Sequence, residues 1–361
     1  MLLIRENVPS ATIQSLSFDY FFNNHYKGES SMMYFIDNQG ITDPRINLAI
    51  EEYAVKHLDI EHTYLLFYIN EPSIIIGKNQ NTIEEINTEY VEENHLHVVR
   101  RLSGGGAVYH DLGNLNFSFI RKDEEGSFLN FKKFTEPVVE ALKQLGVHAE
   151  LQGRNDILVD GRKISGNAQF STKGRIFSHG TLMFNSEIDN VVSALKVRKD
   201  KIASKGIKSI RSRVANIAEF LEEPISMEEF KKELLKHIFA GVDEIPEYKL
   251  TEEDWQKIHE ISKERYQNWD WNYGRSPKFD IQHSHRFPVG RIEFRLNVNK
   301  GVITECKIFG DFFGVGDVAE VEKQLVGVRY ERSAIAKALN EIDHQHYFGN
   351  VDFDELVHLI Y

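Results

Sequence analysis

Residues 100–111 read Arg-Arg-Leu-Ser-Gly-Gly-Gly-Ala-Val-Tyr-His-Asp, and this stretch decides which folds the chain can have. Three adjacent glycines carry a large entropy cost on ordering, which favours a place where a ligand touches main chain closely. Residues 96–99 form a short apolar run and residues 114–119 alternate polar with apolar, so both flanks predict strands. A dinucleotide fold or a P-loop needs a helix directly after its glycines, and the P-loop also needs a Gly-Lys-Ser/Thr ending. Neither feature is present, so the glycines predict a strand-loop-strand that bends around a ligand.

Two interpretations of this loop stay open at this point. The paired Arg100 and Arg101 indicate that the ligand is anionic. The alternative is a simple hairpin turn, although two residues such as Asn-Gly would suffice to make one.

The composition restricts the class of protein. A length of 361 residues predicts two domains with ample buried core. The net charge of -12 argues against non-specific nucleic-acid binding, which requires broad neutralisation of phosphates. The single cysteine, Cys306, excludes an internal disulfide and a cysteine-rich zinc site. No apolar run approaches the length of a membrane span, and the N-terminus lacks a basic region followed by an apolar core. These features predict a cytoplasmic protein that binds neither nucleic acid nor membrane.

The first two-thirds of the chain follow an irregular opening segment. Residues 1–32 show no sustained periodicity and predict an N-terminal extension of doubtful role. Residues 33–245 predict one domain in which helices accompany a largely antiparallel sheet. One helix is predicted to open at Asp43-Pro44, where a proline at the first turn costs nothing, and another to run over residues 131–145.

Residues 246–361 predict a smaller accessory domain. A capping signal at residues 251–254 predicts the start of a helix. Residues 291–297 and 302–308 alternate around Asn299-Lys300-Gly301, the pattern of a hairpin, and a closing helix is predicted over residues 334–339.

A second polar cluster lies in residues 153–169. Asn155 and Asp156 offer two oxygen ligands at a strand start, which Mg²⁺ accepts, although an Asx turn explains the pair equally well. Lys163 lies near Ser165 and Gly166, whose small size leaves room for a substrate. Its ammonium group can contact a substrate carboxylate that is being converted to an acyl phosphate. The alternative is that Lys163 is an ordinary solvated side chain.

Two further clusters carry weaker information. His179 precedes Gly180 and Thr181 at a strand entrance, where it can bind a ligand or hold a loop carbonyl. Residues 196–213 carry eight basic residues against one acid, which predicts a phosphate site or a docking surface for an acidic partner, with a solvated segment as the alternative. The chain has neither a Gly-x-Ser-x-Gly elbow nor a His-Glu-x-x-His motif.

Taken together, these clusters resemble the signature of the lipoate-protein ligase A family. The matching segments are residues 100–111, 153–156, 163–168, 179–182 and 205–214, in order and with family-like spacing. The resemblance covers roughly residues 33–361, whereas residues 1–32 depart from the family pattern. It implies an α+β fold. A biotin/lipoate-ligase catalytic domain, related to class II aminoacyl-tRNA synthetases with a mixed, largely antiparallel sheet, would precede a small α/β accessory domain.

The resemblance also implies a two-step, ATP-dependent reaction. Lipoate, or octanoate, and MgATP would give an acyl adenylate and pyrophosphate. The acyl group would then pass to a lysine of a lipoyl domain, as in the E2 subunits of 2-oxoacid dehydrogenases, or of the glycine-cleavage H protein. The resemblance implies a monomer, and reorientation of the small domain between the two steps.

Roles for individual residues follow from the same resemblance. Lys163 would be catalytic and would hold the carboxylate and acyl-phosphate oxygens, and Asp156 would assist Mg²⁺. The residues implied to bind substrate or adenylate are Arg101, Ser103, Gly104, Gly105, Gly106, Val108, Tyr109, His110, Asn155, Ser165, Gly166, Ala168, His179, Gly180, Thr181 and Lys205.

Three rival functions remain on the sequence alone. An octanoyl or lipoyl amidotransferase of the same fold works through a cysteine thioester, and residues 1–305 contain no cysteine. A biotin-protein ligase would carry a Gly-Arg-Gly-Arg-x-Gly type of loop in place of residues 103–106. A non-catalytic module that binds lipoyl domains or lipoate is disfavoured because Lys163 and the whole glycine loop are retained.

Overall fold

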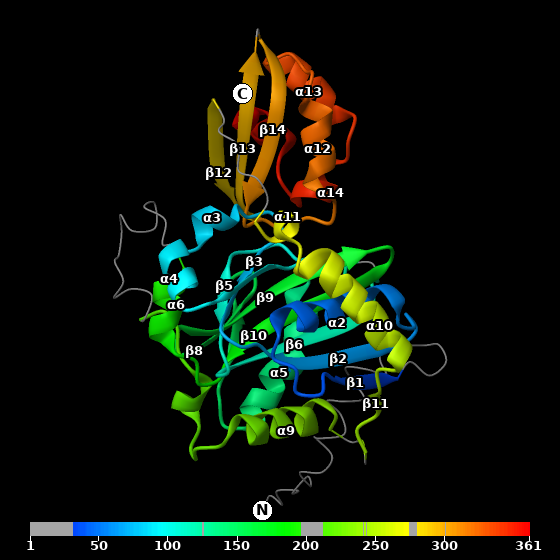
Figure 1. The fold of residues 1–361 in the computed structure, drawn as a ribbon, viewed down its shortest axis with the longest axis vertical. Helices are drawn as coiled ribbons and strands as arrows, with labels where there is room; N and C mark the ends of the chain where they lie inside the picture. Colours follow the sequence, from blue (N-terminus) through cyan, green and yellow to red (C-terminus); the bar gives the residue numbers. More distant parts are fainter. Residues whose placement is uncertain are drawn as a thin grey trace, which may run out of the picture.

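The computed structural model describes residues 32–124, 126–195, 212–240, 242, 244–273, 280–299 and 301–361. Within these ranges the chain forms a large body and a smaller C-terminal body, which follow one another along the long axis of the molecule (Figure 1). The predicted extension, apart from Met32, lies outside the described residues, as does the basic segment up to residue 211.

The large body is built on an eight-stranded sheet with the order β11-β1-β2-β6-β10-β9-β8-β7. The first strand pairs in parallel with both of its neighbours, and the remaining pairs are antiparallel, which confirms the predicted α+β class with a largely antiparallel sheet. The strands are β1 (Met33–Asp37), β2 (Thr63–Ile69), β6 (Asn114–Lys122), β7 (Glu150–Gln152), β8 (Asp156–Val159), β9 (Arg162–Thr172), β10 (Arg175–Met183) and β11 (Glu247–Tyr248).

Helices cover both faces of this sheet (Figure 1). One face packs against α2 (Pro44–His57) and α10 (Glu252–Ile261), and the other against α5 (Phe131–Gln144) and α9 (Met227–Ile238). The two predicted helices of the first domain are confirmed: Asp43 caps α2 by accepting from the Arg45 amide at 2.8 Å, and α5 stops before Gly146 at φ 82°.

Strand β6 has one apolar face and one polar face, as its alternating sequence predicts. Leu115, Phe117 and Phe119 point into the core beneath α5 and α9. The intervening residues lie on the α2 side, and Asn116 and Ser118 are buried there as well. A strand that is buried on both faces but polar on one requires polar partners, so this face is where a site is expected.

A second, three-stranded sheet carries the glycine loop. Its order is β4-β3-β5, made of β4 (His97–Arg100), β3 (Ser73–Ile76) and β5 (Val108–His110), with residues 101–107 connecting β4 to β5. The glycines do connect two strands, as predicted. The second strand is β5, inside the motif, whereas the strand predicted over residues 114–119 is β6 of the large sheet. The remaining short elements of the large body are α3 (Thr82–Glu85), α4 (Thr88–Glu93), α6 (Ile188–Ala194), η2 (Ile217–Phe220), the π-helical turn η3 (Ser262–Tyr266) and α11 (Trp269–Asn272).

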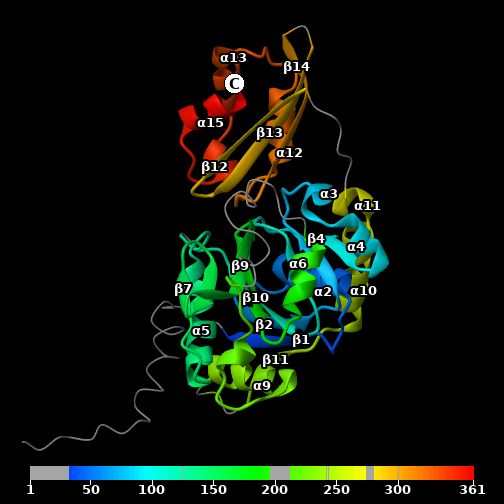
Figure 2. The same cartoon turned by 90° about the vertical axis from the view of Figure 1, so that its left-hand side faces the viewer.

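The C-terminal body packs helices onto one face of an antiparallel sheet, as Figure 2 shows from the side. Ile292, Phe294 and Leu296 point from its central strand into an apolar core of its own. The elements are β12 (Ile281–Phe287), β13 (Gly290–Asn299), β14 (Val302–Gly310), α12 (Val318–Leu325), α13 (Arg332–Asn340), α14 (His344–Phe348) and α15 (Phe353–Ile360). The predicted hairpin is confirmed. The helix predicted over residues 334–339 forms as α13, but it does not close the chain, because α14 and α15 follow it.

Some residues after position 245 pack with the large body rather than with the C-terminal body. β11 pairs with β1, and Ile258 of α10 is fully buried in the core shared with α2, so residues 247–272 pack with the large body. Thr251 does cap α10, as its sequence predicts. We propose a domain boundary between Tyr273 and Asp280.

Candidate active site

A cavity of about 260 Å³ opens on the α2 side of the large sheet, beneath the glycine loop. It receives side chains or main chain from α2, β2, β3, β5, β6, β9, β10 and the loop itself. Most of the residues expected from the sequence lie in its wall: Arg101, Gly105, Gly106, Val108, His110, Asn155, Lys163, Gly166, Ala168, His179, Gly180 and Thr181.

Other expected residues lie next to the cavity or elsewhere. Ser103, Tyr109 and Ser165 are buried outside its wall, and Asp156 is linked to it through an ion pair with Lys163. Gly104 faces the C-terminal body. Lys205, expected to contact the adenylate, lies outside the described residues.

Both arginines of the glycine-loop motif donate to main-chain oxygens. Arg101 donates to the carbonyl oxygens of Ile75, Gly104 and Gly106 at 2.7–3.1 Å. Arg100 donates to the carbonyl oxygens of residues 77, 78 and 80 at 2.6–3.1 Å. Burial lowers the pKa of each guanidinium to about 10, so both stay charged at neutral pH. Arg100 and Arg101, which indicated an anionic ligand, therefore hold the loop in shape. Their charges are largely engaged by main-chain carbonyl oxygens rather than left for a ligand.

The three glycines meet different surroundings. A Cβ on Gly104 would lie 2.4 Å from the Phe312 carbonyl oxygen of the C-terminal body. Gly105 has a φ of +92°, which side chains rarely adopt, and its carbonyl oxygen would lie 2.0 Å from a Cβ on Gly77. A Cβ on Gly106 would meet no atom within 4 Å, so this position faces open space at the cavity.

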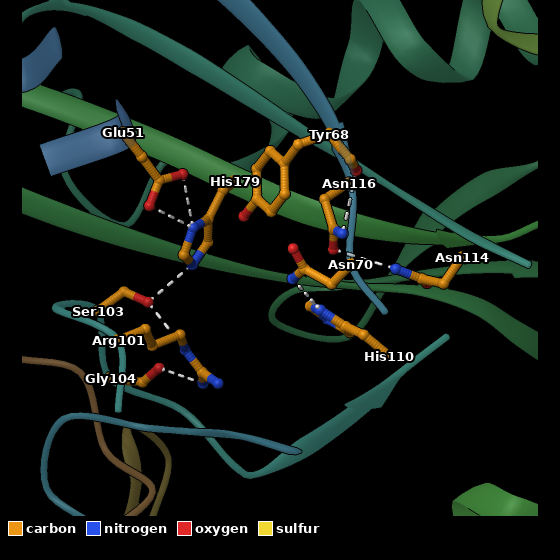
Figure 3. Close-up of polar contacts among 10 residues, drawn as sticks. All are labelled: Glu51, Tyr68, Asn70, Arg101, Ser103, Gly104, His110, Asn114, Asn116 and His179. Carbon is orange, nitrogen blue, oxygen red and sulfur yellow. Dashed lines mark hydrogen bonds and ion pairs between the residues drawn. The ribbon is translucent and has the colours of Figure 1, made fainter. Parts of the chain in front are cut away.

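A buried hydrogen-bond chain fixes one wall of the cavity (Figure 3). The Ser103 hydroxyl lies 2.8 Å from Nε2 of His179, whose Nδ1 lies 2.9 and 3.0 Å from the two carboxylate oxygens of Glu51. Arg101 Nε donates to the same hydroxyl at 3.0 Å. Because a carboxylate can only accept, Nδ1 of His179 donates its proton to Glu51. Glu51 on α2 thus orients His179, which in turn holds the glycine loop.

The other end of the cavity carries the ammonium group of Lys163, which forms an ion pair with a carboxylate. Lys163 Nζ lies 2.8 Å from Asp156 Oδ1, and the two side chains are 37% and 39% exposed. A Cβ on Gly166 would lie 2.9 Å from Nζ, so glycine there gives the ammonium its room. The main chain of Lys163 bonds to that of Arg213 and Ala215 at 2.7 and 3.0 Å, which fixes the start of β9.

The C-terminal body contacts the rim of the site. The Gly310 amide donates to the Asn79 carbonyl at 2.7 Å, and Lys78 Nζ donates to the Gly316 carbonyl at 3.2 Å. The Phe313 ring packs with Phe131, 5.6 Å between centroids, in a small apolar cluster that also contains the cavity residue Ala168.

Several residues of the wall were not expected from the sequence. Leu48, Tyr68 and Ile75 occupy buried helix or strand positions that any apolar core would use. Asn116 did carry a signal, because an amide recurring on one face of an apolar strand needs a partner. Glu51 is hidden among the charged residues of an amphipathic helix.

Family models show the family to which the chain belongs. One for the lipoyl protein ligase A/B catalytic domain matches residues 43–239, and one for the bacterial lipoate protein ligase C-terminus matches residues 276–360. The chain belongs to the lipoate-protein ligase family. A relative, lipoate-protein ligase LplJ of Bacillus subtilis, is 73% identical over 331 residues, which is 91% of this chain and 100% of the relative. The function of the chain is accordingly that of a lipoate-protein ligase, an enzyme.

Solved structures of the family have the same architecture. LipL1 of P. falciparum in complex with lipoate superposes with a TM-score of 0.71 at 26% identity, over 87% of this chain and 94% of that one. A lipoate-protein ligase A bound with ATP gives 0.58 at 29% identity, over 68% and 99%. A bipartite ligase described with its E2 lipoyl domain, from Thermoplasma acidophilum, gives 0.61 at 30% identity, over 70% and 99%. No helix in the described ranges is long and apolar enough to cross a membrane.

Proposed function

We propose that this ligase works in two steps at the cavity beneath the glycine loop. A carboxylate oxygen of lipoate attacks the α-phosphorus of ATP, the bond from that phosphorus to the pyrophosphate oxygen breaks, and lipoyl-AMP forms. The neutral ε-amine of an acceptor lysine then attacks the acyl carbonyl, loses a proton, and AMP leaves with its electron pair. Activation is needed because a carboxylate is a poor acyl donor.

The observation that carries this proposal is the position of Lys163. Its ammonium group is the cavity's one side-chain cation, among the described residues, that is not engaged mainly by carbonyls. There it can neutralise a carboxylate and then the oxygens of an acyl phosphate as charge develops. The rest of the wall, which includes Leu48, Ile75 and Ala168, suits an apolar chain.

The glycine loop has a complementary task in this proposal. Gly106 leaves the space that a side chain would fill, so substrate can approach main chain closely. Ser103, Gly104, Gly105, Val108 and Tyr109 would keep the loop in shape, and Lys205 would approach the adenylate.

Mg²⁺ would be held by Asp156 together with phosphate oxygens. Its carboxylate is partly exposed beside the cavity, and Mg²⁺ is commonly bound through one or two carboxylates plus substrate phosphates and waters. The described residues contain no group of three or more His, Cys, Asp or Glu that could hold a metal ion. The ion would neutralise phosphate charge during adenylation.

The acceptor would be the lysine of a lipoyl domain, as in E2 subunits or the glycine-cleavage H protein. The Thermoplasma ligase described with its E2 lipoyl domain supports this class of partner. We also propose a monomer that acts in the cytoplasm, with neither nucleic acid nor membrane as a partner.

Exchange of labelled pyrophosphate into ATP, dependent on lipoate, tests the first step. We expect exchange by the wild-type protein and a loss of about 100- to 1000-fold in Lys163→Ala, because one preorganised charge at the reacting oxygens is removed. Lys143→Ala, which removes an exposed lysine from α5, is the matched control. Exchange that persists at the wild-type rate in Lys163→Ala would remove this lysine from the mechanism.

A further inference from the structure

His110 on β5 lies in the wall of the cavity and carries a polar atom that the mechanism does not use. The residue is 4% exposed, and its Nε2 is buried with no hydrogen-bond partner among the described residues. A buried donor or acceptor without a partner is costly, so such an atom in a binding cavity requires an account.

A chain of three asparagine side chains leads to the other ring nitrogen. Asn38 Nδ2 donates to Asn47 Oδ1 at 2.9 Å, and Asn47 Nδ2 donates to Asn70 Oδ1 at 2.9 Å. Asn70 Nδ2 then lies 2.9 Å from Nδ1 of His110 (Figure 3).

The direction of this chain is fixed by main-chain carbonyls. Asn38 Nδ2 and Asn47 Nδ2 lie 2.8 and 2.9 Å from the carbonyl oxygen of Ile41, which can only accept, so both nitrogens are donors. Asn70 must then accept from Asn47 through its oxygen, and its nitrogen faces His110. Nδ1 of His110 therefore accepts, and the proton of the neutral ring is on Nε2.

The surroundings keep the ring in that neutral form. Burial, with the charge of Arg101 and the neighbouring His179, lowers the pKa of His110 to about 3. The result is an N–H donor of fixed direction in a residue of the cavity wall, buried and without a partner among the described residues.

The sheet indicates which part of the occupant lies there. Tyr68 pairs with Asn116 and Asn116 with Thr181, whose hydroxyl accepts from the Gly166 amide at 3.1 Å. These four residues form a row across β2, β6, β10 and β9, and all four line the cavity. The row spans three strand spacings, about 14 Å.

The two ends of this row carry different chemistry. Lys163 lies at the Gly166 end, and His110 lies at the other end, because its partner Asn70 directly follows β2. A substrate whose carboxylate lies at Lys163 therefore directs the far end of its acyl chain toward His110.

We propose that His110 is a specificity-determining residue, whose Nε2–H donates to a sulfur of the lipoate dithiolane ring, and that Asn70 is a positioning residue that keeps the proton on Nε2. This inference rests on the proposed function and names the part of the substrate that is read. Octanoate has the same chain length without the sulfurs. Octanoate leaves Nε2–H without an acceptor, whereas lipoate offers it a sulfur, so the site favours lipoate.

The test compares lipoate with octanoate in the pyrophosphate exchange assay. A sulfur is a weak acceptor, so one such bond corresponds to roughly a 5- to 10-fold preference. We expect His110→Phe to lower the ratio of kcat/KM for lipoate to that for octanoate by about this factor, mainly through KM. Exposed His148, changed to Phe, is the matched control and keeps the ratio.

Asn70→Asp supplies a second variant that reverses the proton. Its carboxylate accepts from Nδ1–H, so Nε2 presents a lone pair toward the sulfur and the ratio falls as well. The ¹⁵N shifts of His110 should show the proton on Nε2 in the wild-type protein and on Nδ1 in Asn70→Asp.

The outcomes separate the two levels of the argument. A ratio that stays constant while both acids lose activity equally would mean a structural role for His110, and a wild-type proton on Nδ1 would equally overturn the inference. Absence of exchange with either acid in the wild-type protein would instead overturn the proposed function and this inference with it.

Discussion

Gly104 and Gly106 offer a matched pair of substitutions that separates stability from substrate binding. Both belong to the same loop, and neither has a φ in the left-handed region. Alanine therefore adds one methyl group at each position without backbone strain. Only the surroundings differ: at Gly104 the new Cβ meets the Phe312 carbonyl at 2.4 Å and the Phe313 ring at 3.2 Å, whereas at Gly106 it meets open space.

The expected magnitudes follow from these distances. The contact at Gly104 is with main chain of the C-terminal body, which cannot rotate away, so one body must shift against the other. Overpacking of this kind costs about 1–3 kcal/mol of unfolding free energy. Gly106→Ala should change stability by less than about 0.5 kcal/mol. Its methyl group enters the cavity, so we expect the KM for lipoate to rise roughly tenfold, a cost of about 1.4 kcal/mol.

Urea unfolding and exchange kinetics on both variants measure these effects. All three tryptophans lie in the large body, at residues 255, 269 and 271, so their fluorescence reports that body while far-UV circular dichroism reports both. For Gly104→Ala we expect the circular dichroism transition to begin at lower urea. Equal stability of the two variants, or an unchanged KM in Gly106→Ala, would refute the assignment of the loop's two faces.

Three more perturbations test other parts of the site. Glu51→Ala should cost about 1–3 kcal/mol of unfolding free energy and lower exchange activity, because Nδ1–H of His179 loses its acceptor. Glu51→Gln keeps an acceptor oxygen and should lose less stability and activity. Equal losses in the two variants would contradict this account. The pKa of His110 is about 3 in the folded protein and about 6.5 in the unfolded chain, so its contribution to the free energy of unfolding is complete above pH 6.5. Below that pH the contribution is lost, by up to about 1.4 kcal/mol per pH unit. In urea titrations, His110→Phe should flatten the fall of unfolding free energy between about pH 6.5 and 4. Burial raises the pKa of the Cys306 thiol, so a thiol reagent should not label the native protein. Cys306→Ala should keep full ligase activity. Loss of acyl transfer in that variant would favour a thioester route.

The fold could be predicted where the sequence alternates or caps. The glycine loop between two strands, the helix that opens at Pro44 and the C-terminal hairpin all follow from local pattern. The packing of residues 247–272 with the large body could not be predicted, because β11 has only two residues and shows no period. The capping sequence at Thr251 is the same whether its helix begins a new domain or packs against the preceding one. α10 packs against the preceding one.

The grouping of residues around the cavity could be predicted where they sit in motifs that are short along the chain. Lys163, Gly166 and His179 come together as expected because β9 and β10 are neighbours. The role of the arginine pair was not visible, since a sequence cannot show how many carbonyl oxygens surround a guanidinium group. Tyr68 was not predicted to line the cavity, because a tyrosine in an apolar strand indicates only that the residue is buried.

The length of the cavity is the property that no local motif encodes. The row from Tyr68 to Gly166 is made by four strands whose order along the chain differs from their order in the sheet. Strand spacing is fixed by main-chain hydrogen bonds, so side-chain changes alter the ends of the cavity more easily than its span. In the mechanism that we propose, chain-length selection would rest on the sheet, while Lys163 and His110 would set the chemistry accepted at either end. Substitutions at the two ends should therefore change which acid is preferred without changing how long a chain is accepted.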